Sequence, residues 1–245
     1  MLGLSANTEE LEREVREALE AVKGLRAAAR ADAQRAADRL ALRAWQAERL
    51  AGSYPDLLAS DRHRPAAEFF LSDLYGPKDF SQRDTEVTRI LPTMERMLPD
   101  AAMRAFGAAI ELDYLSEYLD AQVAKTIRAG QGRGALAITP ERYAAAYRDC
   151  GHVEERRQQI ELVDAIGRAL DRLTRMPLMS AGLELMRGPA RMAGLSEIHD
   201  FFKRGFDAFK HMRGAEEFLR TIRTRETRLM ERLLAGTPDP FAGLG

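Results

Sequence analysis

The spacing of apolar residues is helical along almost the whole chain, and this limits the fold more than any other feature. Apolar side chains recur three and four residues apart, which places them on one face of a helix. The nearest approach to a strand, residues 135–138, is too short to count as one. Gly and Pro residues divide the pattern into segments joined by short loops. The sequence therefore predicts an all-α, multi-helix bundle of about seven to nine helices.

The N-terminal region, residues 1–52, has the pattern of one long amphipathic helix or of two helices in line. Five of its side chains alternate spacings of four and three, as in the narrow seam of a coiled coil. Asp32 interrupts this seam, which then resumes four residues out of step. The seam suits either packing on the body of its own chain or formation of a homo-oligomer. Its members are Leu11, Val15, Ala18, Val22 and Leu25.

The remaining chain is predicted to form one bundle domain and a tail. Residues 65–235 contain the bundle, with a central helix over about residues 101–128 whose wide apolar arc implies contact with more than one neighbour. Residues 236–245 are rich in Gly and Pro and carry no helical pattern. They are predicted to form a flexible tail.

Composition narrows the class of protein. A net charge of −1 gives no global field that would recruit nucleic acid or an anionic membrane. The lone cysteine, Cys150, excludes an intramolecular disulfide and fits a reducing compartment. No apolar run approaches the roughly 20 residues of a membrane span, and the first eight residues lack the parts of a signal peptide. We expect a cytoplasmic protein with no membrane span.

Three carboxylates, Asp113, Glu117 and Asp120, fall on one side of the predicted central helix. Carboxylates at this spacing can bind a metal or share a proton. A di-metal bundle normally adds a Glu-x-x-His motif, and none of the four histidines follows a Glu at that spacing. We therefore expect no metal, and arginine pairing on a solvated edge.

Arginines also share one face of the last helix. Arg225, Arg228 and Arg232 recur there, and Arg outnumbers Lys 32 to 5 along the chain. Several glutamates of the same helix dilute this positive charge. Nucleic-acid binding is accordingly the weaker interpretation of this face.

Residues 69–84 are predicted to form a corner between two helices. Gly76 can close a helix in the left-handed conformation, and Pro77 cannot continue one. Tyr75, Arg83 and Asp84 then lie near the turn, where they act either as a structural clamp or as the rim of a binding site. As a clamp, Arg83 bonds a carboxylate or a helix C-terminal carbonyl. The apolar side chains expected to be buried here are Phe69, Phe70, Leu74 and Phe80.

An aromatic face is the second candidate site. Phe202, Phe206 and Phe209 share one side of a predicted helix, and His199 and His211 lie along its edge. Such a face is core, or it lines an apolar cavity for a ligand such as haem or a lipid. Methionine fills adaptable pockets, so four methionines are possible further lining residues. They are Met176, Met179, Met186 and Met192.

Three segments together resemble a bacterial family known as a domain of unknown function. They are the block at 69–84, which contains Tyr75-Gly76-Pro77, then residues 187–195, and residues 201–209 with 214–226. The likeness covers roughly residues 65–230. It implies a helical, cytoplasmic, bacterial protein and supplies no activity, so no catalytic residue follows from it.

Two functional hypotheses remain, and neither names a catalytic residue or a cofactor. The first is a non-catalytic interaction or regulatory protein that self-associates through the N-terminal seam. The second is a small-molecule binding protein or enzyme with an apolar pocket in the helical bundle. The shortage of catalytic motifs favours a protein that is not an enzyme.

Overall fold

The structure is a computed structural model that describes residues 8–74, 81–97 and 100–244, apart from the side chains of residues 8–9, 74, 81–84 and 96–97. Within these ranges the chain contains eleven α-helices, one π-helical segment and no strand, which confirms the all-α prediction. The elements are α1 (Thr8–Arg30), α2 (Ala33–Ser53), α3 (Pro55–Ala59), α4 (Arg64–Phe69), η1 (Phe70–Leu74), α5 (Ser81–Met97), α6 (Asp100–Ala129), α7 (Pro140–Asp149), α8 (Val153–Thr174), α9 (Met179–Met192), α10 (Ser196–Met212) and α11 (Glu216–Ala235).

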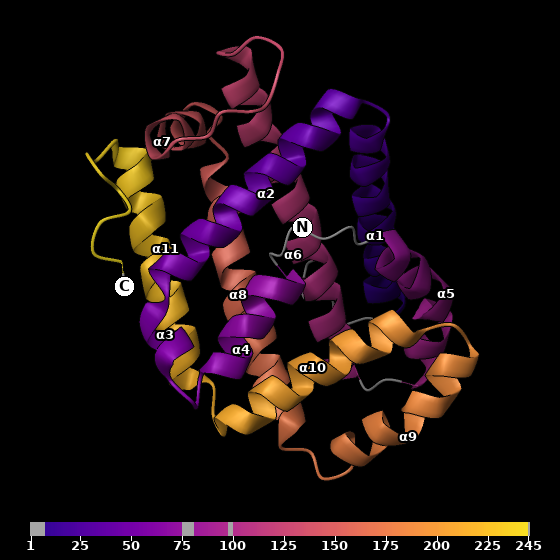
Figure 1. The fold of residues 1–245 in the computed structure, drawn as a ribbon. Coiled ribbons are helices and arrows are strands. Elements are labelled where there is room, and N and C mark those ends of the chain that lie inside the picture. Colours follow the sequence, from indigo (N-terminus) through magenta and orange to yellow (C-terminus); the bar gives the residue numbers. More distant parts are fainter. Residues whose placement is uncertain (1–7, 75–80, 98–99, 245) are drawn as a thin grey trace.

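The N-terminal region forms two helices that reverse direction, not one long helix or two in line (Figure 1). Asp32, the residue that interrupts the seam, caps α2. Its carboxylate accepts hydrogen bonds from the backbone N–H groups of Gln34 at 2.9 Å and Arg35 at 3.1 Å. These bonds satisfy free donors at the start of a helix, so a new helix begins where the seam breaks.

The seam packs on the body of its own chain. Val15 and Val22 are fully buried, and Leu11 and Val15 share a core cluster with residues of α5, α6 and α10. The pattern left open either packing on its own chain or formation of a homo-oligomer, and this arrangement is the first of the two. A homo-oligomer through the same side chains would have to displace α1 from the bundle.

Helix α6 lies at the centre of the bundle, as its wide apolar arc predicts (Figure 1). It packs against α1, α2, α7 and α8. Helices α10 and α11 close the other side of α8. No described helix combines the length and the apolar character needed to cross a membrane.

The helix count exceeds the prediction because residues 54–74 add short elements. After α4 the chain continues as η1, where the wider π-helical turn replaces the α-helical one. Phe69 is buried, and its ring lies so close to α10 that a side chain at Gly205 would begin 2.8 Å from it. The expected corner therefore packs tightly on the side that the structure describes.

The segment after α11 is packed against the bundle, which corrects the prediction of a flexible tail. Leu244 is buried, and the Phe241 ring lies 5.8 Å from the Trp45 ring, edge to face. Arg232 donates a hydrogen bond to the carbonyl oxygen of Pro240 at 3.4 Å and another to that of Ala242 at 2.5 Å. The sequence of the segment conceals its contact with Trp45, because α2 is distant along the chain.

Candidate functional site

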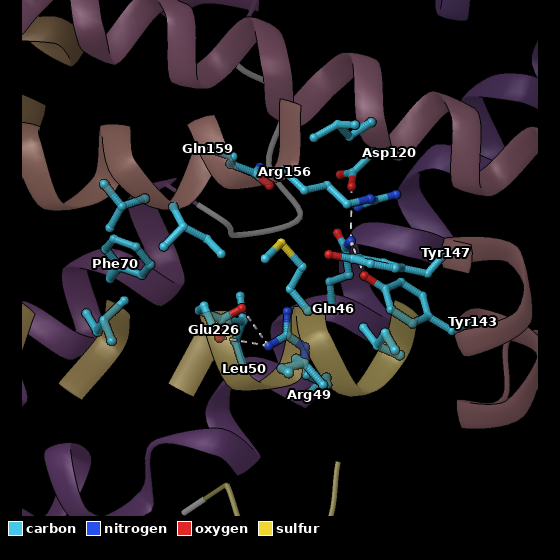
Figure 2. A pocket seen from close by; sticks show the side chains of 17 residues that line it. Gln46, Arg49, Leu50, Phe70, Asp120, Tyr143, Tyr147, Arg156, Gln159 and Glu226 are labelled. Atoms are coloured by element: carbon cyan, nitrogen blue, oxygen red, sulfur yellow. Dashed lines mark hydrogen bonds and ion pairs between the residues drawn. The ribbon is translucent and has the colours of Figure 1, made fainter. Parts of the chain in front are cut away.

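A largely enclosed cavity of about 80 Å³ lies among α2, α6, α7, α8 and α11 (Figure 2). One part of its wall is polar and another is apolar. Figure 2 shows Asp120, Arg156, Tyr143 and Tyr147 grouped on one side, with Phe70 on the other. The apolar part is completed by Leu50, Leu119, Ile160, Val163, Ile222, Leu229, Met230 and Leu233.

Arg156 is the cation of the polar wall, and only 5% of it is exposed. The turn before α8 passes through Gly151 with φ of 70°, a conformation that suits glycine, and the Gly151 carbonyl accepts from Arg156 Nε at 3.3 Å. Arg156 Nη2 donates to Cys150 Sγ at 3.2 Å. The guanidinium lies 3.5 Å from the centre of the Tyr147 ring. Within the described part of the chain, no carboxylate forms a salt bridge with Arg156.

Asp120 is the acid of the same wall. It accepts a hydrogen bond from Gln46 Nε2 at 3.0 Å, and Gln46 also donates to the hydroxyl of Tyr143 at 3.4 Å. Burial raises the pKa of the Asp120 carboxyl from its ordinary value of 3.8 to about 6, against the opposing effect of Arg43. Burial also raises the pKa of Tyr143 and of Tyr147, so both phenols stay protonated.

A complete ion pair forms another wall. Glu226 accepts from Arg49 Nη1 at 3.0 Å and from the Tyr54 hydroxyl at 2.7 Å. Burial alone lowers the pKa of Arg49, but Glu226, Tyr143 and Tyr54 together outweigh this effect and the net shift is upward. These two charges offset one another. Arg156 and Asp120, in contrast, form no salt bridge with any residue that the structure describes, although Arg43 and Arg156 both attract the Asp120 carboxylate.

The cavity thus offers a guanidinium, a carboxyl group that can hold a proton, two phenols and an apolar wall. An engineered cavity of about 150 Å³ holds benzene, so this one takes a ligand of only a few heavy atoms. The polar groups are suited to bind a small anion, with its apolar part against the remaining wall. No group of three or more His, Cys, Asp or Glu residues able to hold a metal occurs among the described residues.

The three predicted carboxylates of α6 have different surroundings. Asp113 and Glu117 pair with arginines as expected, but not on a solvated edge, because Glu117 is only 3% exposed. Arg26 Nε donates to Glu117 Oε1 at 3.0 Å, and Arg39 and Arg43 donate to the same oxygen. Here these five residues are called the Glu117 cluster. Asp120, one helical turn later, faces the cavity instead.

The aromatic face of α10 lies in the core. Phe206 and Phe209 are buried, and the Phe202 ring packs 6.2 Å from that of Phe106. His199 Nε2 lies 2.8 Å from the Leu183 carbonyl oxygen, and His211 Nε2 lies 3.0 Å from that of Asp61. The two histidines therefore tie α10 to neighbouring segments.

The other predicted residues are distributed as follows. Met176, Met186 and Met192 are exposed, which corrects the expectation that they line a cavity. Tyr75, Phe80 and the side chains of Leu74, Arg83 and Asp84 lie outside the described part of the chain. The interpretation of the corner as a clamp or a rim stays a prediction.

The sequence contains a local signal for the cavity, a charged residue within an apolar stripe. Arg156 continues the inward stripe of α8 by one turn, four residues before Ile160. Glu226 interrupts the apolar stripe of α11 between Ile222 and Leu229 in the same way. A charged residue in register with an apolar stripe is buried with it, and so identifies an internal polar site.

The fold and the cavity together define a class, a helical-bundle protein with an internal polar cavity. The chain belongs to the family described as Domain of unknown function (DUF8198), whose family model matches residues 25–240. The matched range contains every residue of the cavity wall. Neither the curated proteins nor the solved structures contain a match to the chain.

Proposed function

We propose that the protein is a ligand-binding protein whose central cavity takes a short-chain carboxylate. The observation that carries this proposal is Arg156, a buried cation that has no salt-bridge partner among the described residues and lines a cavity. A buried charge without a salt-bridge partner costs several kcal/mol, and the Tyr147 ring, the Gly151 carbonyl and Cys150 offset only part of that cost. A bound carboxylate would supply the missing charge and accept two parallel hydrogen bonds from the guanidinium.

The rest of the wall supports a carboxylate with a short apolar tail. Protonated Asp120 can donate to the anion, whereas ionised Asp120 repels it. The apolar side chains opposite suit a tail of one to a few carbons, about what the cavity volume allows. Affinity should therefore rise as the pH falls through about 6, the pKa of Asp120.

The single tryptophan provides a direct test. Trp45 stacks on Tyr143, a wall residue, with 4.5 Å between ring centroids. Titration with formate, acetate, propionate and butyrate should change Trp45 emission in a saturable way, with tighter binding below the pKa of Asp120 than above it. Arg156→Gln should weaken binding by about tenfold or more, because charge-assisted hydrogen bonds contribute about 1.5–3 kcal/mol.

Arg157→Gln is the matched control, since that arginine is the next residue of α8 and its side chain is 53% exposed. It should leave binding unchanged. The proposal fails if no carboxylate gives a saturable change in the wild type. It also fails if both arginine variants bind as the wild type does.

A further inference from the structure

Exposed large apolar side chains are concentrated in one segment. Among the described residues six are exposed, and five of them lie between Met176 and Met192. The sixth, Leu40, is on α2. Three of the five, here called the α9 face, are almost fully exposed: Leu178 at 82%, Leu185 at 79% and Met192 at 85%. A single exposed leucine is ordinary, but such a concentration marks an interaction surface.

The α9 face points away from the bundle. Leu178 is the N-cap residue of α9, and Leu185 and Met192 lie on the helix. The three are spaced seven apart, so they form one line about 21 Å long at the rise of an α-helix. The opposite side of α9 holds the buried Ala190 and the Leu183 carbonyl, which lies 2.8 Å from His199 of α10. Packing on α10 therefore fixes the direction in which the α9 face is presented.

An arginine-lined hollow lies at the same end of the molecule. In Figure 1 the end of α8, the α10–α11 connection and α9 all lie at the bottom. The hollow has a volume of about 460 Å³ and is lined by five arginines and three carboxylates. Arg175 of this hollow directly precedes the apolar segment, and Arg187 and Arg191 lie on α9 itself. The arginines of the hollow are Arg62, Arg168, Arg172, Arg175 and Arg220.

We propose that this end of the molecule docks on an anionic lipid bilayer. Helix α9 would lie parallel to the membrane, with the α9 face among the acyl chains and the arginines at the lipid phosphates. Charge complementarity favours this occupant, because arginines outnumber carboxylates by five to three in the hollow although the chain has a net charge of −1. Arg62 and Arg175 pair with two of these carboxylates, which leaves an excess of arginine for the lipid phosphates. A second copy would bring two positive ends together. Three side chains of one helix also cover less than the roughly 800 Å² per partner of a standard interface.

The test is co-flotation with vesicles of phosphatidylcholine alone and of an equal mixture with phosphatidylglycerol. The protein should float with the mixed vesicles and bind them less as salt is added. It should not float with the vesicles of phosphatidylcholine alone. A triple variant, Leu178→Ser with Leu185→Ser and Met192→Ser, should reduce binding at least tenfold. Its side chains are exposed, so circular dichroism should show an unchanged fold. Leu40→Ser, at the other exposed leucine, is the matched control and should bind as the wild type does.

Several results would overturn the proposal. It fails if the wild type does not bind the mixed vesicles at low salt, or if it binds both vesicle types equally. It also fails if the triple variant binds as strongly as the wild type. Light scattering provides a further one. If the wild type is a dimer and the triple variant a monomer, a second copy covers the α9 face and the assignment to lipid is wrong.

Discussion

Two neighbouring carboxylates of α6, Glu117 and Asp120, have opposite electrostatic surroundings. Glu117 accepts hydrogen bonds from Arg26, Arg39 and Arg43. Asp120 accepts from the neutral Gln46 and carries a raised pKa. At Glu117 the cost of burying a charge is therefore offset by three arginines of the protein. At Asp120 this cost is offset only in part. The bundle supplies three guanidiniums to one glutamate, yet among the described residues it gives neither Arg156 nor Asp120 a salt bridge.

The Glu117 cluster joins three helices of the bundle, α1, α2 and α6. Arg26 comes from α1, Arg39 and Arg43 from α2, and both carboxylates from α6. Arg26 Nη2 lies 2.6 Å from Asp113 Oδ1. Removing one member of such a cluster leaves the others as uncompensated buried charges. This destabilises the fold more than replacing the whole cluster by apolar residues would. The cluster thus holds α1 and α2 against α6.

The largest expected effect is that of Glu117→Gln. It removes the negative charge shared by three buried or half-buried arginines, so the free energy of unfolding should fall by about 3–5 kcal/mol. Urea denaturation measures it. Asp207→Asn is the control, because it breaks the exposed Lys203–Asp207 pair at 2.6 Å and should cost about 0.5 kcal/mol or less. Equal losses in the two variants would mean that the cluster is solvated and that the contrast with Asp120 does not exist.

Asp120→Asn should act in the opposite direction and more weakly. A carboxyl with a raised pKa in the folded state binds more protons there than in the unfolded chain, so it lowers stability as the pH rises from about 4 to about 6. Above about pH 6 the loss of stability caused by the ionised Asp120 no longer changes with pH. The variant should therefore gain about 1–3 kcal/mol of stability near neutral pH and little below pH 4.

Unfolding free energies of the wild type and Asp120→Asn, measured near neutral pH and below pH 4, test this prediction. The gain should disappear at the lower pH, because both proteins are then uncharged at position 120. Acetate binding by the variant should also lose its dependence on pH. A gain of the same size at both pH values would show that Asp120 is not the titrating group.

The helices were predictable from the sequence because their signals are local. Asp32 marks both the break in the seam and the cap of α2, and Thr139-Pro140 starts α7 as a cap followed by proline. The mutual arrangement of the helices was not predictable. A seam such as that of Leu11, Val15 and Val22 has the same spacing whether it meets its own chain or another.

The candidate site was less predictable because its members come from five α-helices and η1. Of its polar residues, the sequence patterns had indicated only Asp120. The aromatic and methionine-rich faces had stronger local patterns and misled the choice of site. Apolar periodicity identifies a buried face, but it does not show whether the opposite side is filled. The better signal was a charged residue within an apolar stripe, as at Arg156 and Glu226.

The smallest expected effect is that of Gln46→Ala, and it tests how Asp120 is held. The Gln46 amide donates to Asp120 and so stabilises its ionised form, which opposes the effect of burial. Without that bond the pKa of Asp120 should rise further, by about one unit or less, because Arg43 and Arg156 still attract the anion. Titration of Asp120 by carbon-detected NMR measures the shift, with Gln34→Ala as the control at another amide–aspartate pair, Gln34–Asp38 at 2.9 Å. An unchanged pKa in Gln46→Ala would mean that burial and the guanidiniums set the charge of Asp120 without help from Gln46. The two carboxylates of α6 would then differ in degree of pairing rather than in kind.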